Sequence, residues 1–329
     1  MHPVLLALFF EFFRPAVLMC SAGLVILALG LPATKNELAR ARGLDKIVAL
    51  SNLCFAIPLA VFGAEHLSGA KSLAMGVPSY MPWPLFWAYF VGFALIAASL
   101  SIATRIQVRW SGLLFGIMMF VFLALIHIPG AYAHPDDRIR WTIVFREMSF
   151  AGGGWALAGA AIGRDRAPGK TLITVGRVLI AIAAIFFAIQ HFRHPLGLPG
   201  VPLAKQMPTW IPARLGQLIG YVTGAFLLVG GASLLLNRKV RTAATNLGSW
   251  ILLEVLLIYG PVLILALSDP STAVQVEGIN YFADTLLFSG AILALASAVP
   301  TRRGPTVGLV ATPAATRRET DLSKISGAG

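Results

Sequence analysis

Nine apolar runs of 17 to 22 residues dominate the chain, with short segments of charged residues, Gly or Pro between them. None of the runs alternates apolar and polar residues as the strands of a membrane barrel do. A helix of about 20 residues crosses roughly 30 Å of hydrocarbon, and inside a bilayer a helix satisfies its own backbone. The pattern therefore predicts an all-α integral membrane protein with nine transmembrane helices, at residues 15–31, 47–63, 85–104, 111–128, 143–163, 172–189, 215–236, 247–267 and 279–299.

Composition agrees with this class. The chain of 329 residues is 57% hydrophobic and 12% charged, with a mean hydropathy of +0.78, which excludes a soluble domain of ordinary make-up. The first run follows Glu11 and Arg14 and is not followed by a small-residue cleavage signature. We therefore expect a retained helix and not a removed signal peptide.

The distribution of Lys and Arg predicts the orientation in the membrane. The segments 32–46, 105–109, 164–171 and 238–242, together with the tail after residue 300, contain seventeen Lys and Arg residues, whereas the opposite set of segments contains seven. Basic residues concentrate in short cytoplasmic loops. We expect the N-terminus outside and the C-terminus in the cytoplasm of a bacterial or archaeal inner membrane. The net charge of +12 is divided among short loops and forms no basic face, so it does not indicate nucleic-acid binding.

Two stretches of the sequence resemble each other in the same order, between apolar runs of similar length. The matched segments are Phe62–Leu67 with Phe187–Phe192, Met81–Pro84 with Met207–Pro212, Phe90–Gly92 with Leu218–Gly220, His127–Pro129 with Tyr259–Pro261, and Phe150–Gly152 with Phe288–Gly290. Duplicated membrane units place their sites near the pseudo-symmetry axis or between the halves.

This resemblance predicts a tandem repeat of a four-helix unit. Because four is an even number of crossings, both copies have the same orientation, and the repeat is parallel. We expect two adjoining four-helix bundles plus one N-terminal helix, divided as follows: an N-terminal helix and cytoplasmic loop at 1–42, a first unit at 43–166, a second unit at 167–300, and a disordered cytoplasmic tail at 301–329.

The repeated unit resembles the DoxX-like family. Phe62 and His66 lie at the outer end of its first helix, the segment Met81–Pro84 leads into its second, and its fourth is apolar and contains glycines. The resemblance covers about three quarters of the chain. It implies an inner-membrane protein associated with quinone-linked oxidation of sulfur compounds or with thiol and oxidative-stress complexes, and it supplies no catalytic set of residues.

Cysteine content argues against thiol chemistry within this chain. Cys20 and Cys54 each lie inside an apolar run, and no Cys-x-x-Cys motif is present. Buried single cysteines behave as small hydrophobic residues. Any sulfur chemistry therefore belongs to a partner.

Histidines form the first group of candidate site residues. His66 and His191 occupy matched positions at the outer ends of two helices, and His127 ends the fourth run on the same side. Imidazoles gathered at one face can hold a haem or a metal ion. Without ligand spacing, the alternative is that they hydrogen-bond loop carbonyls or lipid headgroups, and we predict no metal site. Glu65 is adjacent to His66 in sequence but faces another side of its helix.

Charges inside the apolar runs form the second group, because each is costly in hydrocarbon and is normally paired or lines a cavity. Arg177 and Glu254 lie at similar depths on the first and third helices of the second unit, which predicts an ion pair between them. The first unit has Asn52 and Phe122 at the aligned positions. This difference favours the second unit as the one with a polar interior.

Arg146 and Asp284 are aligned positions of the two units near the outer face, and Glu147 is adjacent to Arg146. If the symmetry axis passes between their helices, Arg146 and Asp284 meet across it. Both predicted pairs have three interpretations: an ion pair that fixes helix register, a pocket for a ligand or quinone headgroup, or a site that handles protons.

Two functions from different classes remain. The first is a non-catalytic membrane subunit or scaffold that docks a redox enzyme or a quinone. The second is a small-molecule permease or binding protein that uses a polar pocket in the second unit. Quinone or haem are the candidate cofactors, and the lipid bilayer and a redox enzyme are the candidate partners. The oligomeric state is not indicated.

Overall fold

The computed structural model describes residues 14–300, and helices are the only extended regular structure in that range. The first half contains α2 (Pro15–Arg40), α3 (Asp45–Ala49), α4 (Ser51–Ser68), α5 (Ala70–Leu73), η1 (Ala74–Gly76), α6 (Pro84–Thr104), α7 (Val108–Phe122), η2 (Leu123–His127), α8 (Ile128–Ala133) and α9 (Arg138–Ile162). The second half contains α10 (Ala167–Arg193), α11 (Ala213–Leu235), α12 (Val240–Glu254), η3 (Val255–Tyr259), α13 (Gly260–Leu267) and α14 (Thr272–Ala298). The predicted disordered tail, 301–329, lies outside the described residues.

The prediction of an all-α membrane protein agrees with this structure. Seven helices are long and apolar enough to cross a membrane: Pro15–Arg40, Pro84–Thr104, Val108–Ala133, Ala167–Arg193, Ala213–Leu235, Val240–Leu267 and Thr272–Ala298. Ser51–Ser68 and Ala70–Gly76 form an eighth only as a pair, bent by 90°. The remaining predicted span, 143–163, overlaps α9, which contains Arg146 and Glu147 and is not among the seven.

Two short connections, one in each half, have the same local form. Arg105 and Gln107 adopt left-handed backbone conformations between α6 and α7, and Asn237 and Lys239 do so between α11 and α12. The helices that follow, α7 and α12, each run into one π-helical turn, η2 and η3, before a proline-containing helix. π-helical turns of this kind are rare and often mark functional sites.

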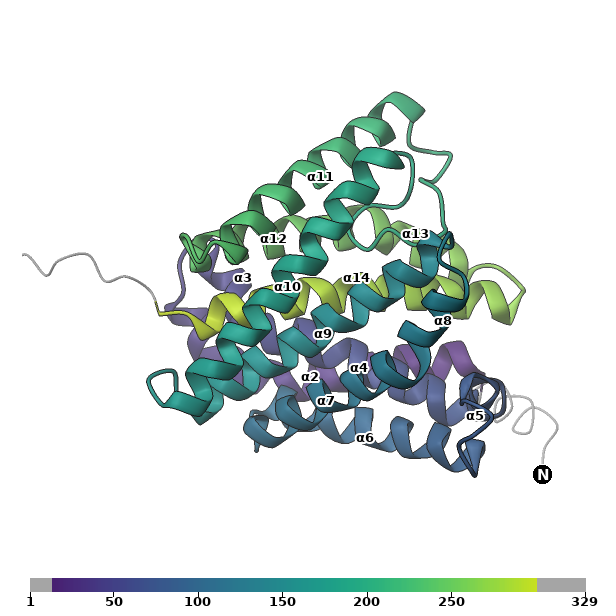
Figure 1. Ribbon diagram of the computed structural model, residues 1–329, viewed down its shortest axis with the longest axis horizontal. Coiled ribbons are helices and arrows are strands. Elements are labelled where there is room, and N and C mark those ends of the chain that lie inside the picture. Colours follow the sequence, from purple (N-terminus) through teal and green to yellow (C-terminus); the bar gives the residue numbers. More distant parts are fainter. Residues whose placement is uncertain (1–13, 301–329) are drawn as a thin grey trace, which may run out of the picture.

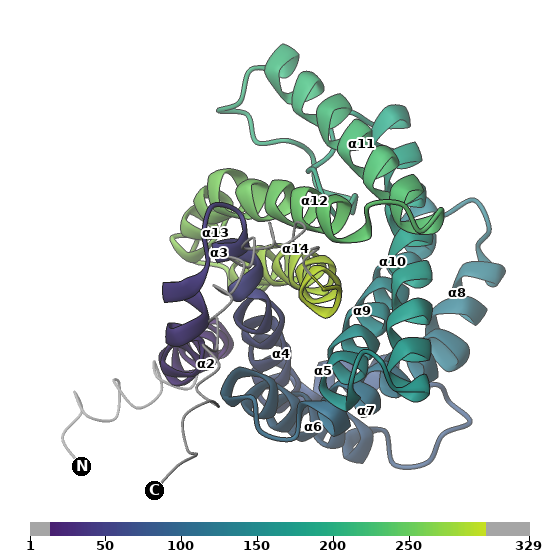
Figure 2. The ribbon, with the colours of Figure 1, turned by 90° about the vertical axis from the view of Figure 1, so that its left-hand side faces the viewer.

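α14 is the central helix of the molecule, and the other helices surround it (Figures 1 and 2). In its most apolar window 83% of residues are buried, against 28–44% for the other six spans. α14 crosses α9 closely at Gly153, where an added Cβ would lie 2.6 Å from Ala291 Cα. Small residues permit such close approaches between membrane helices, which gain no hydrophobic driving force from lipid.

The helices of the two halves interlock. α4 packs against α6 and α14, and α10 packs against α11 and α9, so the first long helix of each predicted four-helix unit contacts the last helix of the other. α7 packs on α9, and α12 packs on α14. The two predicted four-helix units therefore adjoin along α9 and α14, each of which contacts helices of both units.

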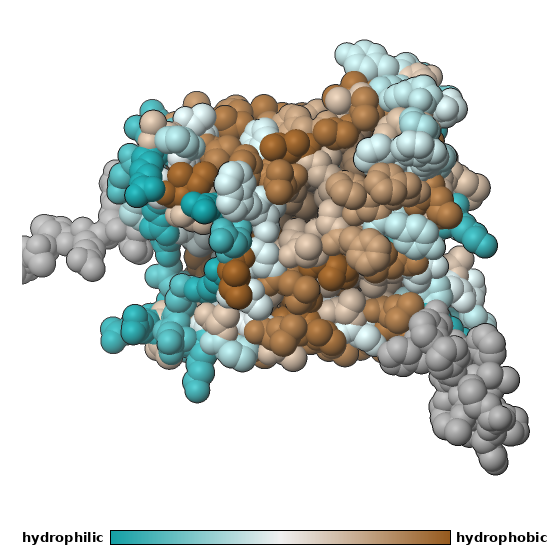
Figure 3. Space-filling model, turned by 90° about the horizontal axis from the view of Figure 1, so that it is seen from below, coloured by the Kyte–Doolittle hydropathy of each residue, from teal (hydrophilic) through white to brown (hydrophobic). Residues whose placement is uncertain are grey.

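The outer surface suits contact with lipid. Figure 3 shows a broad hydrophobic band across the middle of the molecule and hydrophilic residues gathered at its left-hand end. Large apolar side chains on the membrane-spanning helices are exposed, among them Phe93, Leu114, Val229, Leu257 and Ile264, at 59–67% of their surface. The chain is thus membrane-embedded, with apolar helices facing the bilayer.

Candidate ligand cavity in the first half

A buried charge cluster joins α9 to α14. Arg146 Nη1 lies 2.7 Å from Asp284 Oδ2, and Arg146 Nη2 lies 2.8 Å from Glu147 Oε1. The side chains of Arg146, Glu147 and Asp284 are 17%, 9% and 8% exposed. The predicted contact between Arg146 and Asp284 is therefore present. One guanidinium balances two carboxylates, so the cluster carries a formal charge of −1.

A second polar contact joins α4 to α14 next to this cluster. The amide Nδ2 of Asn280 donates to Glu65 Oε1 at 2.8 Å, one helical turn before Asp284. Asn280 Oδ1 is buried and has no partner among the described residues. Sequence reasoning missed Asn280, although a polar residue four positions before Asp284 in an otherwise apolar run marks the same helix face.

His66 faces this polar region with one ring nitrogen already engaged. Its Nδ1 lies 2.8 Å from the carbonyl oxygen of Phe62. A carbonyl only accepts, so Nδ1 bears the proton, and in the neutral ring Nε2 is an acceptor. His127, at the end of the π-helical η2, lines the same space. Among residues 14–300, no three His, Cys, Asp or Glu side chains are arranged to hold a metal ion.

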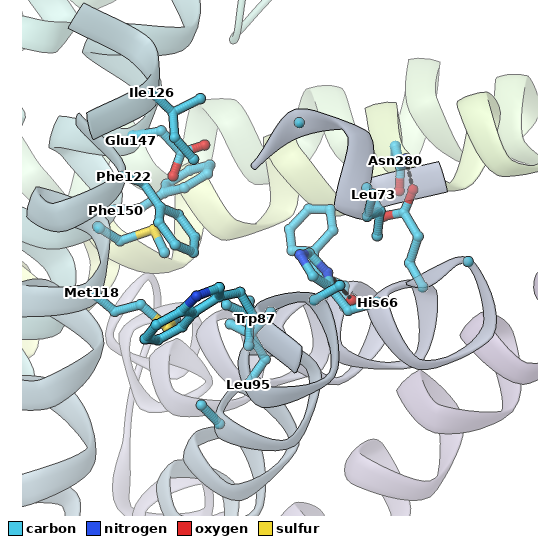
Figure 4. Close-up of a pocket in the computed structure, with 18 of the residues that line it drawn as sticks. His66, Leu73, Trp87, Leu95, Met118, Phe122, Ile126, Glu147, Phe150 and Asn280 are labelled. Carbon is cyan, nitrogen blue, oxygen red and sulfur yellow. Dashed lines mark hydrogen bonds between the residues drawn. The ribbon is translucent and has the colours of Figure 1, made fainter. Parts of the chain in front are cut away.

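These groups lie at one end of a cavity of about 1560 Å³ between α4, α6, α7, α9 and α14. Its other walls are apolar: Figure 4 shows Met118, Phe122 and Phe150 on one side and His66 and Leu73 on the other, with Trp87 between them. Along α7 and η2 the lining extends from Ser111 to Leu125, which is about 21 Å at the helical rise. The cavity is therefore long, apolar over most of its length, and charged at one end.

The cavity opens toward the lipid between α6 and α7. Phe90, Leu114, Ile117 and Val121 line it, and these residues are 50%, 59%, 44% and 43% exposed. A molecule with an apolar chain can therefore enter sideways from the bilayer. Pockets bounded by apolar walls with a few placed polar groups are typical ligand sites.

The predicted Arg177–Glu254 ion pair is wrong. Arg177 donates to the carbonyl oxygens of Leu234 and Leu235 at the end of α11, whereas Glu254 accepts a hydrogen bond from Thr223 on the same helix. Thr223 and Leu234 are eleven residues apart, or roughly 17 Å along α11. The prediction measured depth from the start of the apolar run at residue 247, but α12 begins at Val240. Glu254 therefore lies deeper in the membrane than the apolar run indicates.

Glu254 lies in a small buried polar group. The Thr223 hydroxyl donates to Glu254 Oε1, and Trp250 Nε1 donates to the Thr223 hydroxyl at 3.2 Å. Glu254 is 3% exposed, and its Oε2 has no hydrogen-bond partner among residues 14–300. Sequence reasoning missed Thr223, because a lone Thr in an apolar helix is too common to indicate a contact.

A loop fills the space above this group in the second half. We call residues 197–202, all of which are buried, the plug. His191 Nε2 accepts a hydrogen bond from Gly200 N at 3.1 Å, and the Tyr259 hydroxyl donates to the carbonyl oxygen of Pro199. Leu198 packs among Tyr259 and Tyr281. The polar residues expected inside the second half are this group around Glu254, whereas the cavity described above lies between helices of the first half and α14.

Comparisons with family models, with curated proteins and with solved structures give no match for this chain. The case for its function therefore rests on the geometry of the cavity.

Proposed function

We propose that this chain is a membrane protein that binds an amphiphilic molecule supplied by the bilayer. One observation carries the proposal: a single cavity joins a lipid-exposed apolar opening to the buried Arg146–Glu147–Asp284 cluster. The apolar chain of the ligand lies between α6 and α7. Its headgroup lies beside the cluster, near His66 and Glu65.

Selectivity in such a site comes from the headgroup. An apolar chain gains little by moving from lipid into an apolar protein wall, because the two environments are alike. Polar contacts, in contrast, strengthen where water is scarce. The ligand is therefore recognised by the groups that gather at the charged end of the cavity.

The proposed duplication of the chain helps to explain the site, and equivalent contacts in the two halves support it. Asn52 donates to Ile102 O in the first half, and Arg177 donates to Leu234 O in the second. Residues of α10 follow their counterparts in α4 by 125 positions, and residues of α11 follow their counterparts in α6 by 132 positions. Asn52 therefore corresponds to Arg177, and Ile102 corresponds to Leu234.

Close contacts at glycines follow the same offsets. An added Cβ at Gly92 would lie 3.0 Å from His66 Cβ, and one at Gly224 would lie 3.2 Å from His191 Cβ. The sequence alignment had matched Gly92 to Gly220, one helical turn away. The contacts with the two histidines favour Gly224 as the equivalent residue.

On this correspondence the second half contains the same cavity in a filled form. Where Ala94 and Met118 line the first-half cavity, the second half has Phe226 and Trp250, whose rings stack at 4.5 Å. Phe122 corresponds to Glu254. The plug occupies the remaining space, so one copy is open to a ligand and the other is closed by its own side chains and loop.

Within this proposal, the DoxX-like resemblance favours a non-catalytic subunit in a bacterial or archaeal inner membrane, with nine spans and the C-terminus in the cytoplasm. The candidate quinone has the required shape, with a polar ring on an apolar chain, and its reduced quinol form carries hydroxyl groups that can donate to acceptors at the charged end of the cavity. Because the chain has only two separate cysteines, thiol or electron-transfer chemistry would belong to a redox enzyme that docks against it.

A permease is the second candidate, favoured by one observation. The cavity wall also includes Gly76, Val77, Pro78 and Met81 from the outer connection between α4 and α6. A ligand that enters from the bilayer therefore has a route toward the outer surface. Net movement of the ligand across proteoliposomes would favour transport, and co-purification of a redox enzyme would favour the subunit.

The proposal is tested by placing in the first-half cavity the two aromatic side chains that the second half has at the corresponding positions. Wild type and the double variant Ala94→Phe, Met118→Trp are purified in mild detergent, and bound amphiphiles are extracted and measured by mass spectrometry. We expect an amphiphile near one equivalent in wild type and its loss in the variant.

The control is Leu100→Phe, a change on α6 at a residue that is exposed and does not line the cavity. It should retain the ligand. Equal retention by wild type and by the filled variant would contradict the proposal.

A further inference from the structure

The plug shows how two side chains of the second half hold a polar backbone group. Its Pro199–Gly200 peptide lies between two side chains: the Tyr259 hydroxyl donates to Pro199 O, and His191 Nε2 accepts from Gly200 N. The peptide thus offers an acceptor to one side chain and a donor to the other.

The first half presents the equivalent pair of side chains with no peptide between them. His66 corresponds to His191, and His127 corresponds to Tyr259, at the last position of the π-helical turns η2 and η3. His66 and His127 both line the open cavity. No described residue forms a hydrogen bond to His66 Nε2 or to the His127 ring.

Backbone geometry fixes which group His66 offers. Its Nδ1 lies 2.8 Å from Phe62 O, as His191 Nδ1 lies 2.7 Å from Phe187 O. Both rings therefore carry the proton on Nδ1, and both Nε2 atoms are acceptors in the neutral form. In the second half this acceptor is satisfied by an amide N–H.

The nearby carboxylates provide further hydrogen-bond acceptors at this end of the cavity. One carboxylate oxygen of Glu65 accepts a hydrogen bond from Asn280. Arg146 donates to one oxygen of Glu147 and to one oxygen of Asp284. Their second oxygens accept no hydrogen bond from the described residues. The charged end of the cavity thus has more acceptors than donors.

We infer that His66 and His127 hold the ligand headgroup as His191 and Tyr259 hold the Pro199–Gly200 peptide. His66 Nε2 accepts from an N–H or O–H of the ligand, and His127 donates to the adjacent oxygen. The ligand class is an amphiphile whose headgroup carries a hydrogen-bond donor beside an acceptor, as in an amide or a hydroxyl group. This inference rests on the proposed binding of an amphiphile in the cavity.

The test uses two probes that differ only in the donor. An N-alkylacetamide with a brominated tail has one N–H, and its N-methyl form keeps the carbonyl and the tail but lacks that N–H. Bromine quenches tryptophan fluorescence on contact, and Trp87 lines the cavity. Binding is read in nanodiscs as the saturable quenching that disappears in Trp87→Phe.

We expect the N–H probe to bind about tenfold more tightly to wild type, since the methylated probe leaves the His66 acceptor unsatisfied. His66→Leu should abolish this preference. His66→Gln, which retains an acceptor oxygen, should keep part of it. His134→Leu, at an exposed position after α8, is the control and should keep all of it.

Equal binding of the two probes to wild type, or an unchanged preference in His66→Leu, would overturn this inference and leave amphiphile binding in place. Absence of any saturable quenching that depends on Trp87 would overturn both the inference and the proposed function.

Discussion

Arg146 is the residue on which the polar end of the cavity depends. It neutralises Asp284 from α14 and Glu147 from its own helix while all three are largely buried. Removal of one member of a buried ion pair leaves an uncompensated charge, which costs far more than the pair itself contributes.

Arg146→Met should therefore lower the stability of the folded protein by about 3–5 kcal/mol, measured as the unfolding midpoint in detergent. The matched control is Arg140→Met, which breaks the exposed pair with Asp137 and should cost at most about 1 kcal/mol. Similar losses in the two variants would show that the Arg146 cluster is not buried as described.

Gly200 allows the plug to pass close to α14. Its φ is +87°, and an added Cβ would lie 2.9 Å from Thr285 Cγ2. Gly200→Ala should destabilise the plug by about 1–3 kcal/mol, and residues 197–202 should then exchange amide hydrogens roughly tenfold faster in mass spectrometry. Gly197→Ala is the control, because its nearest neighbour would be His194 O at 3.4 Å. Unchanged exchange in Gly200→Ala would mean that the plug is not held there.

At this scale the sequence predicted one ion pair correctly and one wrongly, for a physical reason. Arg146 and Asp284 were matched as equivalent positions of the proposed duplication, in which positions near the symmetry axis meet their counterparts. Arg177 and Glu254 were matched only by estimated depth. The depth of a residue in the membrane depends on where its helix begins. When polar helical turns precede the apolar run, the first residue of the helix cannot be recognised from hydropathy.

At the scale of helices, close crossings between α9, α14 and their neighbours determine the shape of the cavity. Gly153 sits at the α9–α14 crossing, where an added Cβ would lie 2.4 Å from Ala291 Cβ and 2.6 Å from its Cα. These helices carry Arg146 and Asp284, so their spacing sets the geometry of the charge cluster.

Gly153→Ala should force the two helices apart and cost about 1–3 kcal/mol, seen as a lower melting temperature in detergent. Gly76→Ala adds the same methyl group where nothing lies within 4 Å and should leave the melting temperature unchanged. A Gly153→Ala protein as stable as Gly76→Ala would contradict the close crossing.

Apolar runs predicted the helices well because length and hydropathy decide whether a segment can cross a bilayer. The plug could not be predicted in the same way. Its residues, from Gly197 to Pro202, read as an ordinary Pro- and Gly-containing loop. What buries them is the space between α10, η3 and α14, and this space exists only once the helices have packed.

At the scale of the whole molecule, the proposed orientation places the charged end of the cavity at the outer side of the membrane. The basic loops 105–109, 164–171 and 238–242 lie at the opposite end of the same helices. A reporter fused after Arg303 should be active as a cytoplasmic reporter and silent as a periplasmic one. Activity of the periplasmic reporter alone would reverse the orientation.

The measurement that tests the central claim most directly is an experimental map of the protein in lipid nanodiscs. We predict elongated density inside the first-half cavity, with one end between His66, His127 and Arg146 and the rest along α6 and α7 toward the lipid. The corresponding space in the second half should contain the plug. A first-half cavity without such density, with α6 and α7 packed together and the opening closed, would contradict the account.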